Sequence, residues 1–165
     1  MNMAKAVSLG FLLCSISSAA SYILAQGARS SEPEGTIVLS EKHDGSGANC
    51  SIAFRSGTYE MSSPALDCKR NKMNFFRLIG VPSAARILFT YDNECYTSGD
   101  WFFLVRTYIE SVTTKIISIP DEVALAKPGQ IISKGVLMVN GAKANPDVAN
   151  QLGCIRIEKS DLVKP

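Results

Sequence analysis

Apolar and polar residues alternate with a period of two through most of the stretch from Thr36 to Pro120, and short polar or glycine-containing turns interrupt the alternation. The clearest example begins at Cys50, where Cys50, Ile52 and Phe54 are separated by small or polar residues. Such alternation is typical of strands with one buried face. No part of this stretch sustains a 3.6-residue period, and turns recur every 8–12 residues or so, which predicts a sandwich or barrel.

The pattern also predicts which aromatic side chains are buried. Phe54, Phe89, Trp101 and Phe103 fall on the faces that we expect to point inward. Tyr96 and Tyr108 fall on turns or polar faces, where we expect exposure. The segments expected as strands begin near Thr36, Cys50, Thr58, Phe75, Arg86, Trp101 and Lys115.

Residues 123–165 have a different pattern, and we expect them to form a β extension packed on the domain. Gln130–Val139 predicts a hairpin around a turn at Ser133–Gly135. Asn145-Pro146-Asp147 has the cap, proline and acidic residue of a helix start, and Gly153 could end that short helix. Cys154–Glu158 is expected as a final strand.

The first 27 residues combine one cation, Lys5, with an apolar and small-residue run that ends at Ala25. Small residues in Ala25-Gln26-Gly27 suit a cleavage site before Ala28. These features are typical of a secretory signal peptide, so we expect residues 1–27 to be removed and residues 28–35 to form a flexible leader. The alternatives are a cut nearer Ala20 or an uncleaved membrane anchor.

Export would change the number of cysteines that can form disulfides, because Cys14 would be removed with the signal peptide. An even number of cysteines in an exported protein predicts disulfides, with three possible pairings among four residues. A zinc site would need closely spaced pairs, which the sequence does not contain. The four cysteines of the mature chain are Cys50, Cys68, Cys95 and Cys154.

The charge balance excludes some classes of partner. The mature chain would carry 16 basic and 15 acidic residues, scattered along its length. Nucleic-acid binding normally needs a concentrated basic face, and a membrane-binding patch needs a block of basic residues. We therefore expect a periplasmic or extracellular protein with no nucleic-acid partner and no stable membrane insertion after cleavage. The oligomeric state stays open.

Two parts of the β region look like copies of one unit. Thr36–Glu41 and Cys50–Phe54 parallel Arg86–Tyr91 and Trp101–Leu104, with an offset of about 50 residues. We expect Leu78–Pro82 and Ile116–Pro120 to be the closing segments of the two copies, because each is an apolar run that ends in proline. A duplicated four-strand unit predicts two Greek keys packed face to face.

Residues 36–122 resemble the βγ-crystallin-like proteins, including their secreted microbial members. The second repeat has Tyr91, four residues, Tyr96, and then Gly99, one residue later than the family pattern places the glycine. In the first repeat only Gly47 matches. The resemblance implies a double Greek-key sandwich, in a family that includes secreted proteinase inhibitors.

Many members of that family bind calcium through an acidic or amide pair followed by Ser/Thr-Ser. The stretches compared with this motif are Asn71–Phe76 and Ser111–Lys115, and neither contains a carboxylate. Calcium takes six to eight oxygen ligands, several of them charged. We therefore expect no metal site of this type, and the sequence indicates no cofactor.

The search for catalytic residues yields only weak groupings. The single histidine, His43, lies beside Asp44 in a polar turn, without a G-x-S-x-G nucleophile motif in the chain. Asp92, Glu94 and Asp100 cluster in the equivalent turn of the second repeat. Carboxylate pairs of the glycosidase kind come from distant positions, so the sequence leaves that class open.

These observations favour an exported non-enzymatic binding protein, for example an inhibitor or immunity-type partner of another extracytoplasmic protein. The alternatives are a structural or stress-related envelope protein without a specific partner and a small carboxylate-based hydrolase. The two turns, 42–49 and 92–100, are the expected binding loops, because a stapled scaffold would hold them in a fixed conformation. The candidate binding residues are His43, Asp44, Asp92, Glu94, Tyr96 and Asp100.

Overall fold

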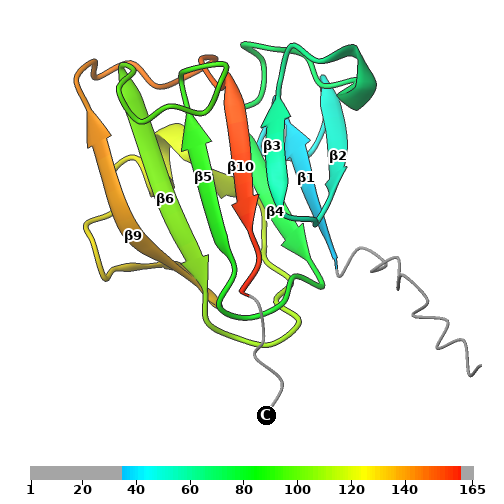
Figure 1. Cartoon of the computed structure of the whole chain (residues 1–165), viewed down its shortest axis with the longest axis vertical. Coiled ribbons are helices and arrows are strands. Elements are labelled where there is room, and N and C mark those ends of the chain that lie inside the picture. The colour runs from blue at the N-terminus through cyan, green and yellow to red at the C-terminus, as the bar shows by residue number, and fades with distance from the viewer. Residues whose placement is uncertain (1–34, 161–165) are drawn as a thin grey trace, which may run out of the picture. The chain divides into compact units, whose positions relative to one another are not determined.

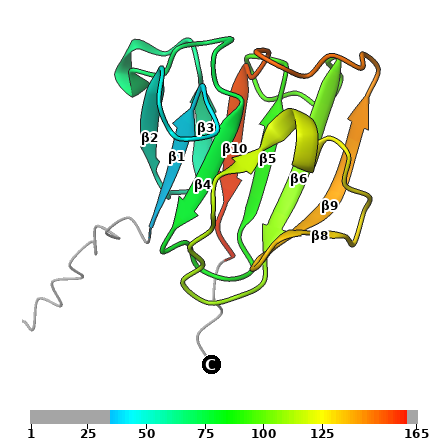
Figure 2. The same cartoon turned by 180° about the vertical axis from the view of Figure 1, so that it is seen from behind.

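The alternating segments form two antiparallel sheets in a computed structural model that describes residues 35–160. Figures 1 and 2 show the sheets as the two layers of a mainly β sandwich, which confirms the expected fold class. In spatial order the four-stranded sheet consists of β2 (Asn49–Ala53), β1 (Thr36–Ser40), β4 (Phe75–Ile79) and β7 (Ile117–Ser118). The six-stranded sheet consists of β3 (Gly57–Glu60), β10 (Cys154–Glu158), β5 (Arg86–Thr90), β6 (Trp101–Thr107), β9 (Val136–Lys143) and β8 (Ile131–Ser133).

The core lies between the sheets and is built from the inward side of each alternating strand. Phe76 of β4 and Phe89 of β5 meet across the two layers with ring centroids 4.7 Å apart. Phe54, Trp101 and Phe103 are also buried, as the sequence pattern predicts. Burying such large side chains supplies much of the driving force for folding.

The strands form two equivalent units, β1–β4 and β5, β6, β7 and β10. Each unit keeps three strands in one sheet and places its third strand, β3 or β7, in the other sheet. The turns after the first strands show the repeat directly. Ser40 Oγ donates to the Lys42 carbonyl, and Thr90 Oγ1 donates in the same way to the Asp92 carbonyl.

Equivalent backbone hydrogen bonds also occur in the two units at the ends of the third and fourth strands. Asn74 N donates to Ser40 O, and Gly153 N donates to Thr90 O. Ile119 N donates to Asn74 O, and Met61 N donates to Gly153 O. The expected duplication is therefore present at the level of individual backbone hydrogen bonds.

The hydrogen bonds also correct which segments are equivalent. Ile116–Pro120 includes β7, which corresponds to β3, and so it is not the counterpart of Leu78–Pro82. The closing strand of the second unit is β10, which pairs with β5 as β4 pairs with β1. Ser111–Lys115 precedes β7 and therefore does not correspond to Asn71–Phe76, which follows β3.

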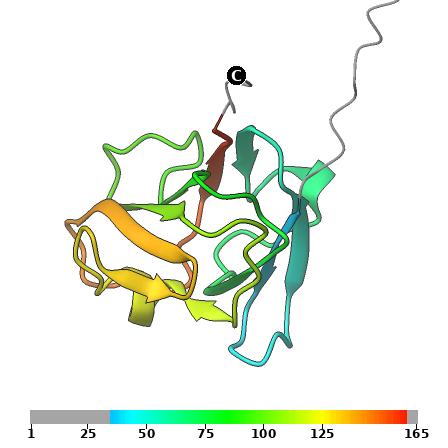
Figure 3. The same ribbon diagram turned by 90° about the horizontal axis from the view of Figure 1, so that it is seen from below.

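The expected domain boundary at residue 122 implied that the C-terminal segment lies outside the sandwich. The structure shows instead that this segment is part of it. Its last strand, β10, lies between β3 and β5 in the six-stranded sheet. The hairpin of β8 and β9 forms where it was expected and extends the same sheet beyond β6. Figure 3 shows this hairpin on the side of the molecule away from β1 and β2.

The prediction of a helix starting at Asn145 is wrong. The Asn145 side chain accepts a hydrogen bond from Asp147 N, and the Asp147 side chain accepts one from Ala149 N, so these residues form successive side-chain turns. Gly153 is needed for packing, because a Cβ there would collide with the Tyr91 carbonyl. The described helical turns lie elsewhere, at η1 (Pro64–Leu66) and η2 (Ile119–Val123).

Two disulfides form, as predicted, and the pairing left open by the sequence is Cys50–Cys68 and Cys95–Cys154. Disulfides of this kind indicate an oxidising, extracytoplasmic environment. The expected signal peptide and nearly all of the leader lie outside the described residues.

Candidate functional site

The predicted binding loops, 42–49 and 92–100, fall in two turns of the structure, 41–48 and 91–100, at the same end of the sandwich. The turn 41–48 follows β1 and the turn 91–100 follows β5, and both arrows point toward the upper end in Figures 1 and 2. Both disulfides lie at this end, because Cys50 and Cys154 lie at the starts of β2 and β10. Each joins one of these strands to a loop, which contains Cys68 in the first case and Cys95 in the second.

In the first turn the acidic side chains hold the backbone. The Glu41 carboxylate accepts a hydrogen bond from Ala48 N at 3.0 Å, and the Asp44 carboxylate accepts one from Ser46 N at 2.9 Å. The Ala48 bond lowers the pKa of Glu41, and hydrogen bonds from Ser46 lower the pKa of Asp44. His43 is exposed and its ring lies edge-on to Phe75, with centroids 6.4 Å apart.

In the second turn one carboxylate organises the loop. Asp92 Oδ1 accepts hydrogen bonds from Glu94 N at 2.7 Å and Tyr96 N at 3.1 Å. Between them lies Cys95, whose backbone has a φ of 61° and whose side chain is bonded to Cys154. The next side chain, Tyr96, is 59% exposed. The turn therefore presents an aromatic side chain from a backbone that is fixed at three adjacent positions.

The candidate residues therefore form two groups, those that stabilise the turns and those that are exposed on them. Asp44 and Asp92 are committed to the conformation of their own turns. His43, Glu94, Tyr96 and Asp100 are exposed, and the Asp100 carbonyl accepts a hydrogen bond from Ala144 N. Within residues 35–160 no three His, Cys, Asp or Glu side chains are grouped so that they could hold a metal ion.

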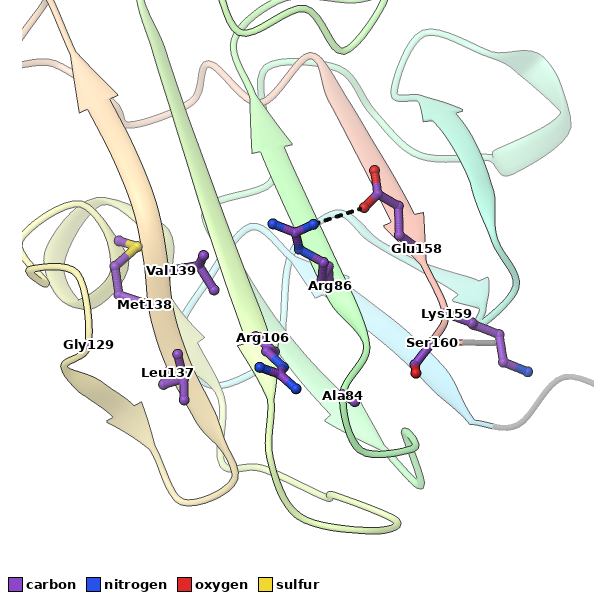
Figure 4. A pocket seen from close by; sticks show the side chains of 10 residues that line it. All are labelled: Ala84, Arg86, Arg106, Gly129, Leu137, Met138, Val139, Glu158, Lys159 and Ser160. Atoms are coloured by element: carbon purple, nitrogen blue, oxygen red, sulfur yellow. Dashed lines mark ion pairs between the residues drawn. The ribbon is translucent and has the colours of Figure 1, made fainter. Parts of the chain in front are cut away.

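A second surface, which sequence reasoning missed, lies on the outer face of the six-stranded sheet. It is an open groove of about 570 Å³ that crosses β9, β6, β5 and β10 near the end opposite the loops (Figure 4). Its lining is formed by Ala84, Arg86, Arg106, Gly129, Leu137, Met138, Val139, Glu158, Lys159 and Ser160.

Charged side chains dominate one part of this groove. Arg86 and Arg106 are direct cross-strand partners. Arg86 Nη1 lies 3.8 Å from Glu158 Oε2, and the other oxygen of Glu158 lies 3.4 Å from Arg156 Nε. Figure 4 shows Arg86 turned toward Glu158, whereas the Arg106 guanidinium lies toward the Ala84 end. Leu137 and Val139 supply an apolar wall on the β9 side.

The sequence contained only part of the signal for this groove. The alternation around Arg106 indicates a polar strand face, but only the register across three strands places Arg86 and Glu158 beside it. Register between distant strands is set by packing, so a single sequence did not reveal the cluster.

Comparisons with family models, with curated proteins and with solved structures found no match for this chain. Among the described residues there is no helix long and apolar enough to span a membrane.

Proposed function

We propose that this chain is an exported binding protein that recognises another extracytoplasmic protein through the turn 91–100. The observation that carries the proposal is Tyr96, which is 59% exposed and follows a disulfide-bonded cysteine in a turn held by the Asp92 carboxylate. Tyrosine is enriched among the residues that contribute most to protein–protein binding.

The fixed turn supports this role because binding carries an entropic cost. A flexible loop loses conformational freedom when it docks, and a loop that is already ordered loses less. The Cys95–Cys154 bond and the two hydrogen bonds to Asp92 order this turn before any partner arrives. An inhibitor or immunity-type partner would use a turn of this kind.

Two further elements belong to the proposal. Residues 1–27 would direct export, in keeping with the disulfides of the described domain. The resemblance to βγ-crystallin-like proteins gains support from the duplicated hydrogen bonds, because that family is built from two such units.

The test is capture of a partner from the envelope and secreted fractions of the native host. Wild type and the Tyr96→Ala and Leu125→Ala variants would be compared, since Leu125 is similarly exposed at 66% but lies outside the turn. We expect wild type and Leu125→Ala to capture the same protein, and Tyr96→Ala to bind it at least ~30-fold more weakly.

Photo-crosslinking from position 96 should label that same protein in intact cells. Equal capture by the Tyr96→Ala variant would reject the turn as the contact. Failure of wild type to capture any protein would favour the structural envelope role.

A further inference from the structure

We propose that the outer-face groove binds an acidic segment of a protein, in which a carboxylate lies next to an apolar side chain. The inference rests on the proposed binding role only in taking a protein segment as the ligand. It concerns a surface at the opposite end of β5 from the turn that carries Tyr96.

The first argument is the placement of like charges. Side chains directly opposite each other on antiparallel strands lie about 4.5–5.5 Å apart at Cβ, and like charges in such pairs are destabilising. Arg86 and Arg106 are paired in this way on β5 and β6. A bound anion between or beside them would relieve this repulsion.

The second argument is incomplete neutralisation within the protein. Among the described residues that line the groove, Glu158 is the only carboxylate, and it contacts both Arg86 and Arg156. Arg106 takes part in no ion pair with any residue between 35 and 160. The described lining of the groove therefore carries excess positive charge, and arginine forks suit carboxylates in geometry as well as in charge.

The third argument comes from the matching face of the other sheet. The registers place Thr36, Ala53 and Ile79 at the positions that correspond to Arg86, Arg106 and Glu158. The charged cluster is thus not a general requirement of the fold. It occurs on the sheet that β9 extends, where Leu137 and Val139 add an apolar wall beside the charges.

These features favour a peptide with both acidic and apolar side chains. The arginines would bind its carboxylate, and the β9 wall would cover an adjacent apolar side chain. The groove is open and crosses four strands, so a segment of a folded partner could lie along it.

The experiment uses the full chain, exported into an oxidising compartment and purified from it, with fluorescently labelled peptides as probes. One peptide alternates Glu with Leu, and its control replaces every Glu by Gln. We expect the Glu peptide to bind at low salt, with an affinity that falls as ionic strength rises, and the Gln peptide to bind at least ~5-fold more weakly.

Three variants test the arginine cluster. Arg106→Gln should weaken binding of the Glu peptide by ~5-fold or more. Arg77→Gln removes an arginine that is also exposed, on the outer face of the four-stranded sheet, and its effect should stay within about twofold. Glu158→Gln should strengthen binding by ~2–5-fold, because it releases Arg86 and removes a competing carboxylate.

The sign of the Glu158→Gln effect separates a ligand site from a structural ion pair, since loss of a purely structural pair would weaken binding or leave it unchanged. Equal effects of Arg106→Gln and Arg77→Gln, equal binding of the two peptides, or no binding up to ~1 mM peptide would each overturn the proposal. Binding of anionic phosphatidylglycerol vesicles in place of the peptide would also overturn it. Tyr96→Ala should leave peptide binding unchanged, so loss of partner capture in that variant concerns the loop proposal alone.

Discussion

The two units of the sandwich have the same hydrogen-bond framework but carry different additions. Between paired positions the first turn has 8 residues, 41–48, and the second has 11, 91–101. The connection after the third strand runs over 61–74 in the first unit and over 119–153 in the second, where it contains η2, β8 and β9. The first unit is close to the minimal repeat, and the second is an elaborated copy.

The candidate surfaces follow this difference. The fixed turn with Tyr96 and the groove with Arg86 and Arg106 both belong to the second unit. The groove exists in its present form because β9 lies beside β6, whereas β2, the counterpart of β6, is at the edge of its sheet. Comparison of the two units thus distinguishes residues that the fold requires in both from residues that only one unit has and that are available for recognition.

The disulfides also differ between the units, and their removal should have the largest effect on stability. Cys95–Cys154 closes a loop with a sequence separation of 59, and Cys50–Cys68 closes one of 18. Loop-closure entropy predicts losses of ~4 and ~3 kcal/mol for the two double alanine variants. Urea unfolding of each variant measures the loss.

Hydrogen exchange would show where each disulfide acts. Loss of Cys95–Cys154 should raise exchange in the turn 91–100 and leave the turn 41–48 protected. Equal changes in both turns would mean that the units are not separate in their local stability.

Thr107 marks a buried position at which the two units use different chemistry. Its hydroxyl donates to Pro82 O at 2.7 Å and accepts from Ala85 N at 3.0 Å, whereas the counterpart in the first unit is the apolar Phe54. Thr107→Val should destabilise the protein by ~2 kcal/mol, because the buried Ala85 N–H and the partly buried Pro82 carbonyl lose their partner.

Thr107→Ser keeps the hydroxyl and should cost about half as much, from the lost methyl group alone. Chemical unfolding of both variants gives the comparison. Similar losses for Val and Ser would show that packing, and not the hydrogen bonds, makes Thr107 important.

The parts of the fold that the sequence predicted are those governed by local alternation. Cys50, Ile52 and Phe54 point inward because the strand period is two, and that period is visible in any single strand. The counterpart of the first closing strand was missed because β10 lies more than thirty residues beyond β7. Ile116–Pro120, an apolar run that ends in proline, lies closer in sequence and resembles Leu78–Pro82 in pattern.

The candidate site was predicted in part for the same reason. Tyr96 could be placed on an exposed turn from local pattern, and its exposure is confirmed. The structural use of Asp92 was not visible, because a carboxylate that accepts backbone hydrogen bonds looks the same in sequence as a solvated one. The helix expected at Asn145 failed because Asn and Asp side chains also stabilise turns.

The acidic residues of the two turns allow a finer comparison. Asp92 accepts two backbone hydrogen bonds and Asp44 accepts one. Asp92→Ala should therefore destabilise the protein by ~1–2 kcal/mol, and Asp44→Ala should have a smaller effect. Thermal or urea unfolding measures both, and a larger effect of Asp44→Ala would contradict the assigned roles.

The smallest expected effect is a pH dependence in the first turn. The pKa of Glu41 is lowered by the hydrogen bond from Ala48 N, and the pKa of Asp44 is lowered by hydrogen bonds from Ser46. Each folded-state pKa lies below its unfolded value, so the unfolded state binds protons first as the pH falls. The contribution of both groups is complete above the usual Glu value of 4.5 and is lost as the pH falls through the folded-state values.

NMR titration of the Ala48 and Ser46 amides between neutral pH and the acid limit of folding measures this effect. Both amides should shift as their acceptors are protonated, and Glu41→Gln should abolish the titration of Ala48 while leaving that of Ser46. An unchanged Ala48 titration in Glu41→Gln would show that another group controls it. Because both carboxylates are at the surface, added salt should reduce the contribution of Lys72 to Glu41 more than that of the Ala48 hydrogen bond.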